Sequence, residues 1–190
     1  MIRASSTIAC LSLATGVAAG QLIDLDASPS TIGPGESTVI TMSAGFDSAD
    51  FAMAGIATEL VINAAEGEFS DLRLIAPMDG PGTSEGVLAG SAIEGIIAGQ
   101  LNFPPAGIYA DPTNPIAFWQ VTFTASVPTG GLILDIETRT SRFDVYTAMG
   151  SATSESRLAD LSEGRAVIFP SPGTAGLLGV GGLLACRRRR

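Results

Sequence analysis

Polar and apolar residues alternate over Ile116–Ser126, and this period of two is the feature that most limits what the chain can fold into. In an extended strand, successive side chains point to opposite faces of a sheet. The expected core face carries Trp119, Val121, Phe123 and Ala125, and the expected solvent face carries Gln120, Thr122 and Thr124. The segment is therefore predicted to be a strand with one buried face.

Similar segments recur between clusters of glycine and proline. Leu132–Thr140 is predicted to direct Leu132, Leu134 and Ile136 inward and Asp135 and Glu137 outward. Further strands are predicted around Phe143–Thr147 and over Leu22–Ala27, Ser37–Ala44, Gly55–Asn63, Phe69–Ala76, Val87–Ile97 and Arg165–Phe169. Helix signals are scarce, and the best is Ser154–Leu161, where Ser154 is the candidate cap of a short turn that carries Leu158 and Leu161. About nine short strands predict an all-β fold, a single antiparallel β-sandwich or jelly roll over residues 21–169.

The first twenty residues have the pattern of a secretory signal peptide. Arg3 precedes an apolar stretch, and Ala18, Ala19 and Gly20 supply the small residues at which signal peptidase cuts. The stretch is shorter than the roughly 20 residues that a membrane-spanning helix needs. We therefore expect cleavage between Gly20 and Gln21 and export of the rest of the chain.

The C-terminal residues 170–190 form a second signal. Pro170, Ser171, Pro172 and Gly173 interrupt the preceding strand, an apolar run follows up to Cys186, and Arg187, Arg188, Arg189 and Arg190 close the chain. A proline break, an apolar run and terminal arginines that stay on the cytoplasmic side predict a short hydrophobic helix that halts in the membrane. The alternative to a sorting signal is an uncleaved membrane anchor.

These last residues resemble the PEP-CTERM sorting tail, the recognition signal of exosortase, with Ser171 where that family usually has glutamate. The resemblance implies processing by signal peptidase and an exosortase-like enzyme at the inner membrane. It further implies removal of the tail near Pro172 and delivery to the cell surface or extracellular matrix.

A second, looser resemblance concerns the predicted sandwich. The Pro-Gly turn within Ser28–Glu36, the strand beginning Ser37–Ile40 and the late strand Phe118–Phe123 are similar to those of cohesin-like bacterial surface domains. This resemblance implies a cohesin-like β-sandwich, in a setting of surface assembly or extracellular polysaccharide.

Charge and composition exclude several classes of function. Residues 21–169 carry five arginines against nineteen acidic residues, a net charge of −14, which repels nucleic acid. The only cysteines, Cys10 and Cys186, lie in the terminal segments, and histidine is absent from the sequence. Disulfides, Cys/His zinc sites and histidine-based triads are therefore excluded from the predicted sandwich.

Carboxylates are the remaining candidates for chemistry. Asp135 with Glu137, or Glu66, Glu68 and Asp71, contain the two acids that a glycosidase requires, but exposed acids on a strand or turn explain both groups better. Calcium is the one metal that this composition favours, with Asp47 and Asp50, or Asp111 and Asn114, as its candidate ligands. Neither pair lies in an EF-hand loop, and solvated loop side chains explain both pairs better. No catalytic or cofactor-binding residue is predicted.

Three functions follow from these observations. The first is a surface or matrix-associated structural or adhesion protein without enzymatic activity. The second is a carbohydrate-binding module, which would use exposed aromatic residues among Phe103, Tyr109 and Trp119. The third is a hydrolase with two carboxylates.

Overall fold

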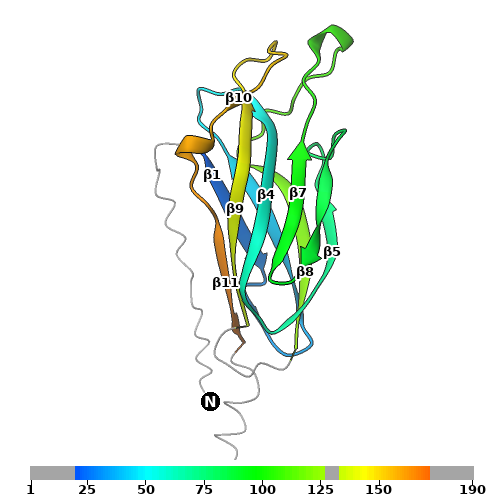
Figure 1. Ribbon diagram of the computed structural model, residues 1–190, viewed down its shortest axis with the longest axis vertical. Coiled ribbons are helices and arrows are strands. Elements are labelled where there is room, and N and C mark those ends of the chain that lie inside the picture. Colours follow the sequence, from blue (N-terminus) through cyan, green and yellow to red (C-terminus); the bar gives the residue numbers. More distant parts are fainter. Residues whose placement is uncertain (1–19, 127–132, 172–190) are drawn as a thin grey trace, which may run out of the picture.

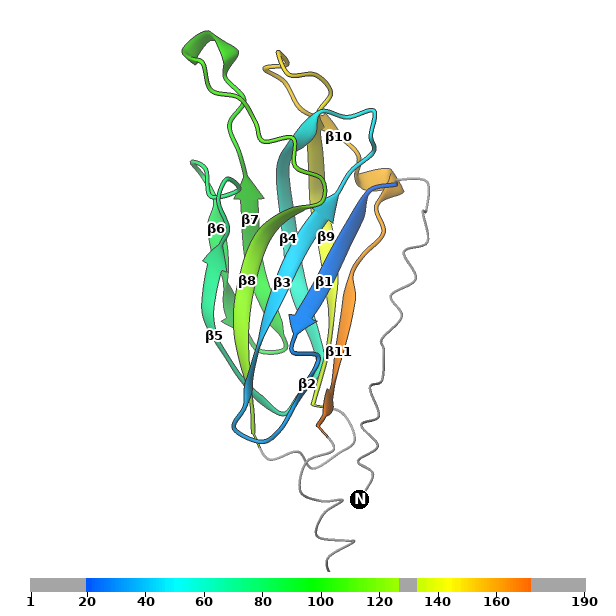
Figure 2. The ribbon, with the colours of Figure 1, turned by 180° about the vertical axis from the view of Figure 1, so that it is seen from behind.

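The computed structural model describes residues 20–126 and 133–171, which form two β-sheets packed face to face (Figure 1; Figure 2). The small sheet has four antiparallel strands in the order β1–β3–β8–β5. Their bounds are Leu22–Ser28 for β1, Ser37–Gly45 for β3, Ile116–Ala125 for β8 and Gly67–Leu74 for β5. The predicted all-β sandwich is thus confirmed.

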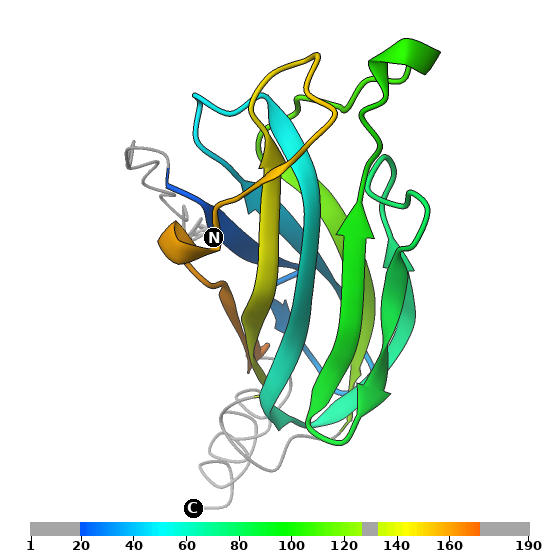
Figure 3. The same ribbon diagram turned by 45° about the horizontal axis from the view of Figure 1, so that its top comes forward.

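The large sheet follows the order β2–β11–β9–β4–β7–β6, and β10 pairs with β9 beside this path. Its strands are β2 (Thr31–Ile32), β11 (Arg165–Pro170), β9 (Leu134–Tyr146), β4 (Ala52–Ala65), β7 (Ala92–Gly99), β6 (Ser84–Ala89) and β10 (Glu155–Ser156). The β2–β11 pair is parallel. Figure 3 shows β9, β4 and β7 lying side by side along the middle of this sheet.

The alternating pattern of β8 places its side chains as predicted. Trp119, Val121, Phe123 and Ala125 are buried between the sheets, together with Leu134 and Ile136 of β9. Phe118 is buried as well. The polar residues of β8 alternate with this set and lie toward solvent.

Trp119 links an interior strand of the small sheet to the edge strand of the large sheet. Its side chain is fully buried, and its indole Nε1 donates a hydrogen bond to the backbone oxygen of Glu85 in β6 at 2.8 Å. On the other edge strand, Phe69 of β5 packs against Phe123 with a distance of 5.0 Å between ring centroids. Trp119 is therefore a core residue and presents no face to a sugar.

Two predicted strand assignments are wrong in detail. Val87–Ile97 was expected as one strand but is a hairpin of β6 and β7, because Gly90 adopts a φ of +61° at the turn. The segment around Phe143, expected as a separate strand, continues β9. The described residues contain eleven strands where about nine were expected.

The short turn predicted within Ser154–Leu161 is present, but Arg157 and not Ser154 precedes it. The segment contains strand β10 and a single 3₁₀ turn, η2 (Leu158–Asp160), because the backbone N–H of Arg157 donates to the oxygen of Phe143 at 2.8 Å. A second 3₁₀ turn, η1 (Pro104–Ala106), lies between β7 and β8. Among the residues that the structure describes, no helix is long and apolar enough to cross a membrane.

Only the inner ends of the two predicted terminal signals are described. Gly20 is exposed, whereas Gln21 is buried and its backbone oxygen accepts a hydrogen bond from Ser162 at 2.9 Å. Pro170 ends β11, and the N–H of Ser171 donates to the oxygen of Ile32. The remainder of the predicted signal peptide, Leu132, and the tail with Pro172, Gly173, Arg187, Arg188, Arg189 and Arg190 lie outside the described residues.

Candidate functional site on the large sheet

The outer face of the large sheet carries unusually small side chains at its centre. Ile97 of β7, Ala57 of β4 and Arg142 of β9 lie in one cross-strand row. In a neighbouring row, Gly99 pairs with Gly55, and Gly55 pairs with Asp144. Residues opposite one another in neighbouring strands share a face of the sheet. The middle of this face therefore lacks the side chains that would fill it.

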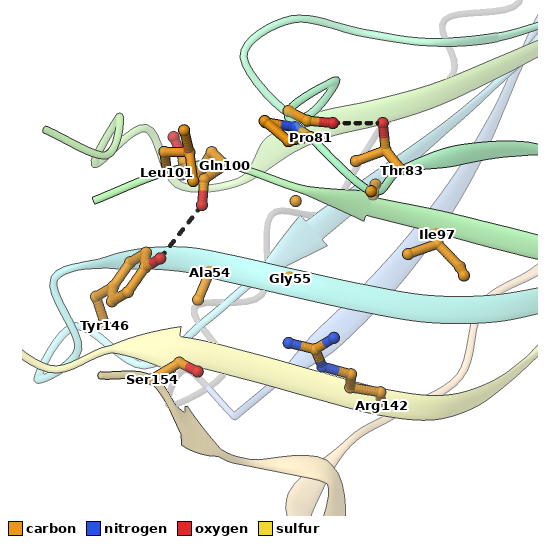
Figure 4. Close-up of a pocket in the computed structure, with 14 residues that line it drawn as sticks. Ala54, Gly55, Pro81, Thr83, Ile97, Gln100, Leu101, Arg142, Tyr146 and Ser154 are labelled. Carbon is orange, nitrogen blue, oxygen red and sulfur yellow. Dashed lines mark hydrogen bonds between the residues drawn. The ribbon is translucent and has the colours of Figure 1, made fainter. Parts of the chain in front are cut away.

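This absence of side chains produces a surface hollow, the Gly55 hollow, with a volume of about 180 Å³. A Cβ atom on Gly99 would lie 3.2 Å from the backbone oxygen of Ala54, so the two strands approach closely there. Figure 4 shows Arg142 and Tyr146 on one side of the hollow and Pro81 and Thr83 on the other.

Hydroxyl groups around the Gly55 hollow hold its walls in place. Tyr146 Oη donates a hydrogen bond to the backbone oxygen of Gln100 at 3.2 Å, which links β9 to the end of β7. Thr83 Oγ1 donates to the backbone oxygen of Gly80 at 2.7 Å and closes the turn before β6. Both hydroxyls thus use their protons within the protein.

Arg142 supplies the positive charge of the hollow. Its Nε donates to a carboxylate oxygen of Asp144, and more than half of its side chain is exposed. Its Nη2 lies 3.6 Å from where a Cβ on Gly55 would be, so the guanidinium extends over the hollow (Figure 4). An arginine in this position can bind a carboxylate or a backbone carbonyl of a partner.

A second hollow, of about 520 Å³, lies further along the same face, where Gly95 and Ala57 leave space beside Arg139 and Ser141. Arg139 Nη1 lies 3.1 Å from Glu59 Oε1, and both hollows are lined by Ile97, which is 37% exposed. We call the two hollows together the large-sheet face. It is an extended, shallow surface with an apolar residue on β7 and two arginines on β9, on the other side of β4.

The paired carboxylates of β9 do not form an acid–base pair. Asp135 accepts hydrogen bonds from Arg165 Nε at 2.9 Å and Nη2 at 2.7 Å, and these bonds lower the pKa of its carboxyl group. A carboxyl group with a lowered pKa stays ionised and cannot act as a general acid near neutral pH. Glu137 is paired in register with the same arginine.

The other acidic candidates are spread along the edge strand β5. Glu68 is exposed opposite Thr124. Asp71 is exposed in an irregular part of the strand with a φ of +53°, and the backbone N–H of Glu66 donates to Ile133. Glu68 and Asp71 belong to the small sheet, Glu66 lies just before β5, and none of the three lines a hollow of the large-sheet face.

Asp47 and Asp50, the first proposed calcium pair, hold the turn between β3 and β4. Asp47 Oδ1 accepts a hydrogen bond from the N–H of Ala49 at 2.8 Å. Asp50 is buried, and its two carboxylate oxygens accept bonds from Arg157 Nη2 at 2.9 Å and Nε at 3.2 Å. Hydrogen bonds to Asp50 and Glu155 raise the pKa of Arg157 further above its usual range.

The second calcium pair also takes part in local hydrogen bonds. Asp111 Oδ1 accepts bonds from the N–H and the hydroxyl of Thr113, which lower the pKa of the Asp111 carboxyl group. The side chain of Asn114 bonds both backbone groups of Phe46. Within residues 20–126 and 133–171, no three acidic side chains are grouped to hold a metal ion.

Sequence reasoning missed the large-sheet face. Phe103 and Tyr109 are exposed, as a carbohydrate site would require, but they lie in the loop after β7 and not on a sheet face. The available signal was the spacing of Gly95 and Gly99, which also suits bulges in a strand. Only the cross-strand register places Gly99 in the hollow that Arg142 lines and Gly95 in the hollow that Arg139 lines.

Comparison with known proteins identifies the fold. No family model matches the sequence, and neither does any curated protein. The seventh type I cohesin of ScaB from Pseudobacteroides cellulosolvens matches the structure with a TM-score of 0.51 and 11% identity, over 81% of this chain and 94% of that module.

Two further matches are the cohesin of a cohesin–dockerin complex with OlpA from Clostridium thermocellum and the sixth cohesin of Acetivibrio cellulolyticus scaffoldin B. Both have a TM-score of 0.47. Their identities are 12% and 16%, over 79% and 78% of this chain and 99% and 97% of the matched chains, respectively. The match to the ScaB module shows that the fold is a cohesin-like β-sandwich.

Proposed function

We propose that this chain is an exported, non-catalytic surface module of the adhesion or scaffold type, which binds a protein partner through the large-sheet face. The observation that carries the proposal is the pair of shallow hollows that share Ile97 of β7 and are lined on β9 by Arg142 and Arg139, respectively. Because β-sandwiches serve many functions, the proposal rests on this face and not on the fold.

The shape of the face favours a macromolecule. Small-molecule sites are usually concave enough to bury most of the ligand, whereas the two hollows are open and continuous along three strands. Ile97 is an apolar centre with exposed arginines beside it, and arginine is enriched in protein interfaces. A protein segment lying across β9, β4 and β7 would contact all three residues.

The position of the chain end supports an anchored module. The C-terminal end of β11, after which the proposed sorting tail begins, lies at the opposite end of the sandwich from the loop that connects β7 and β8 (Figure 1). A tail held at the membrane would direct that loop away from the cell. We therefore retain, as part of the proposal, a signal peptide cut before Gln21 and a tail processed near Pro172.

Intact mass tests the export part of the proposal. The protein is purified from the cells that produce it, separately from the membrane and extracellular fractions. An extracellular form that begins at Gln21 and ends near Pro172 is the expected result. A form that keeps Arg190 and occurs only in membranes would replace the sorting tail by a plain anchor.

Photo-crosslinking tests the binding part. A p-benzoylphenylalanine placed at Ile97 in the full chain should form an adduct with a different protein in the producing cells. Arg142→Ala should reduce the adduct about tenfold, because removing a charged interface partner costs about 1.4 kcal/mol or more. Arg73→Ala on the small sheet is the matched control and should leave the yield unchanged. Equal yields from the two variants would contradict the proposal.

A further inference from the structure

The loop between β7 and β8, residues 100–115, reverses the usual relation between polarity and burial. Gln100 and Asn102 are buried, whereas Leu101, Phe103, Ile108 and Tyr109 are exposed by 48%, 52%, 43% and 50% of their surface. Large apolar groups exposed together on a soluble domain mark a contact surface. We call residues Leu101–Tyr109 the apolar loop.

The buried amides give the apolar loop a fixed shape. Gln100 Nε2 donates to the oxygens of Met53 at 2.7 Å and Asp111 at 3.1 Å, and its Oε1 accepts from the N–H of Asp111 at 2.7 Å. Asn102 Oδ1 accepts from the N–H of Ala110 at 3.3 Å. Both polar side chains therefore support the base of the loop from inside, which leaves its apolar side chains facing out.

The tip of the apolar loop is closed by its own backbone. The N–H of Phe103 donates to the oxygen of Ile108 at 2.8 Å, and the reverse bond is 3.3 Å long. Pro104 and Pro105 form the 3₁₀ turn between them. Because prolines and paired backbone groups limit its conformations, the tip would lose little entropy on binding.

A neighbouring loop adds a fifth apolar side chain to this end of the molecule. Asn102 Nδ2 donates to the backbone oxygens of Met149 at 3.3 Å and Ser151 at 2.7 Å, which ties the loop after β9 to the apolar loop. Met149 is 54% exposed. Figure 3 shows both loops projecting beyond the ends of β7 and β9.

Charge narrows the choice of partner. Two acids adjoin the loop base: Asp111, whose backbone bonds Gln100, and Asp79, which forms a bridge with Gly99. Residues 21–169 carry a net charge of −14, and the apolar loop itself contains no lysine, arginine, aspartate or glutamate. Repulsion disfavours both an anionic membrane and a second copy of this chain, whereas a basic protein surface would be attracted.

We propose that the apolar loop inserts into an apolar depression on a second protein, and that lysine or arginine residues surround this depression. Leu101 also lines the Gly55 hollow, so the apolar loop adjoins the large-sheet face, but the proposed contact uses the side chains beyond Leu101 and does not require Arg142. Its aromatic and methionine side chains are of the types enriched in protein interfaces. Phe103 and Tyr109 are the expected anchors of the contact.

The test uses two phenylalanines that are matched in exposure. Phe103 and Phe169 are 52% and 54% exposed, and Phe169 lies near the end of β11, at the opposite end of the sandwich. Each is replaced by p-benzoylphenylalanine in the full chain, and the producing cells are irradiated. Position 103 should give an adduct with a different protein that position 169 does not give, and Arg142→Ala should leave this adduct unchanged.

Mass spectrometry of the adduct then identifies the contact, and binding of the purified partner is measured. Phe103→Ser should weaken the affinity about 30-fold, as expected of an interface anchor, and Phe169→Ser should not change it. Affinity should fall as salt is raised. Equal thermal midpoints of the two serine variants verify that both remain folded.

Four results would overturn the inference: an adduct with twice the mass of the chain, adducts with lipid alone, no adduct at position 103, and a partner contact that is acidic or insensitive to salt. If the otherwise unmodified chain forms no adduct from position 97 but does form one from position 103, the proposed function is refuted and this inference stands.

Discussion

The two outer faces of the sandwich carry different kinds of side chains. On the small sheet, polar side chains bond one another across strands: Arg73 Nη2 donates to Gln120 Oε1 at 2.7 Å, and Gln120 Nε2 lies 2.9 Å from Thr41 Oγ1. On the large sheet, Gly55 and Gly99 leave the centre of the face unfilled.

This difference concerns side chains and not the presence of a hollow, because a hollow of about 380 Å³ also lies beside Arg73 and Gln120 on the small sheet. A side-chain network that satisfies its own donors and acceptors gains little from a partner. A hollow with an arginine extending over it can still gain contacts. The same strand pattern underlies both faces, so the contrast depends on a few outward positions.

The largest effect on stability is expected from Trp119, which packs between the two sheets. Trp119→Ala removes the buried ring and its bond to Glu85, and should lower the free energy of unfolding by about 3–5 kcal/mol. Urea unfolding followed by circular dichroism measures the change. Thr122→Ala on the solvent side of the same strand is the control. A loss below about 1 kcal/mol would mean that the sheets are not joined through Trp119.

Filling the hollow should separate binding from stability. Gly55→Val places a Cβ 3.4 Å from the oxygen of Ala98, an ordinary contact, and replaces a glycine in a strand interior. The adduct formed at Ile97 should fall about tenfold, while the free energy of unfolding changes by less than about 1 kcal/mol. An unchanged adduct would show that the hollow is not part of the binding face.

The reverse result is expected on the small sheet. Gln120→Leu removes the hydrogen bonds to Arg73 and Thr41 and should lower the free energy of unfolding by about 1 kcal/mol. The adduct at Ile97 should stay the same. A fall in adduct yield with this variant would contradict the claim that binding uses the large sheet and not the small sheet.

The smallest expected effect is on the loss of stability at acidic pH, through the carboxyl group of Asp135. The pKa of Asp135 is lower in the folded protein than its ordinary value of 3.8, because Arg165 hydrogen-bonds the ionised form. Its contribution to stability is present above pH 3.8 and is lost as the pH falls through this value toward the folded pKa.

Asp135→Asn should therefore reduce the loss of stability between about pH 5 and pH 3, measured by urea unfolding at each pH. Asp24→Asn, an exposed acid opposite Ser43 on the small sheet, is the comparison. A steeper loss in the Asp135 variant than in the unmodified protein would reverse the assigned sign.

Sequence reasoning predicted most strands because burial of one strand face requires polar and apolar residues to alternate along the chain. The alternation in β8 predicted the buried side of Trp119, Val121 and Phe123. It failed at Val87–Ile97, where a glycine turn lies inside an apolar stretch. It also misplaced the start of the turn within Ser154–Leu161. Arg157 bonds the distant residues Asp50 and Phe143, and these contacts outweigh the local capping signal of Ser154.

The candidate sites were less predictable because they depend on contacts between distant residues. The acids proposed as metal ligands or catalysts are spaced suggestively, yet Asp50 binds Arg157 and Asp135 binds Arg165. Nothing in the sequence near Asn102 indicates that it is buried and supports an exposed apolar loop.

The sequence alone determined the period-two strands, the strong negative charge and the lack of cysteine and histidine in residues 21–169. These properties belong to single residues or to neighbours along the chain. Only the tertiary structure decided that Gly55, Gly99 and Arg142 form one hollow and that the apolar loop faces outward. The physical reason is that strand register and loop support are set by contacts between residues far apart in the chain.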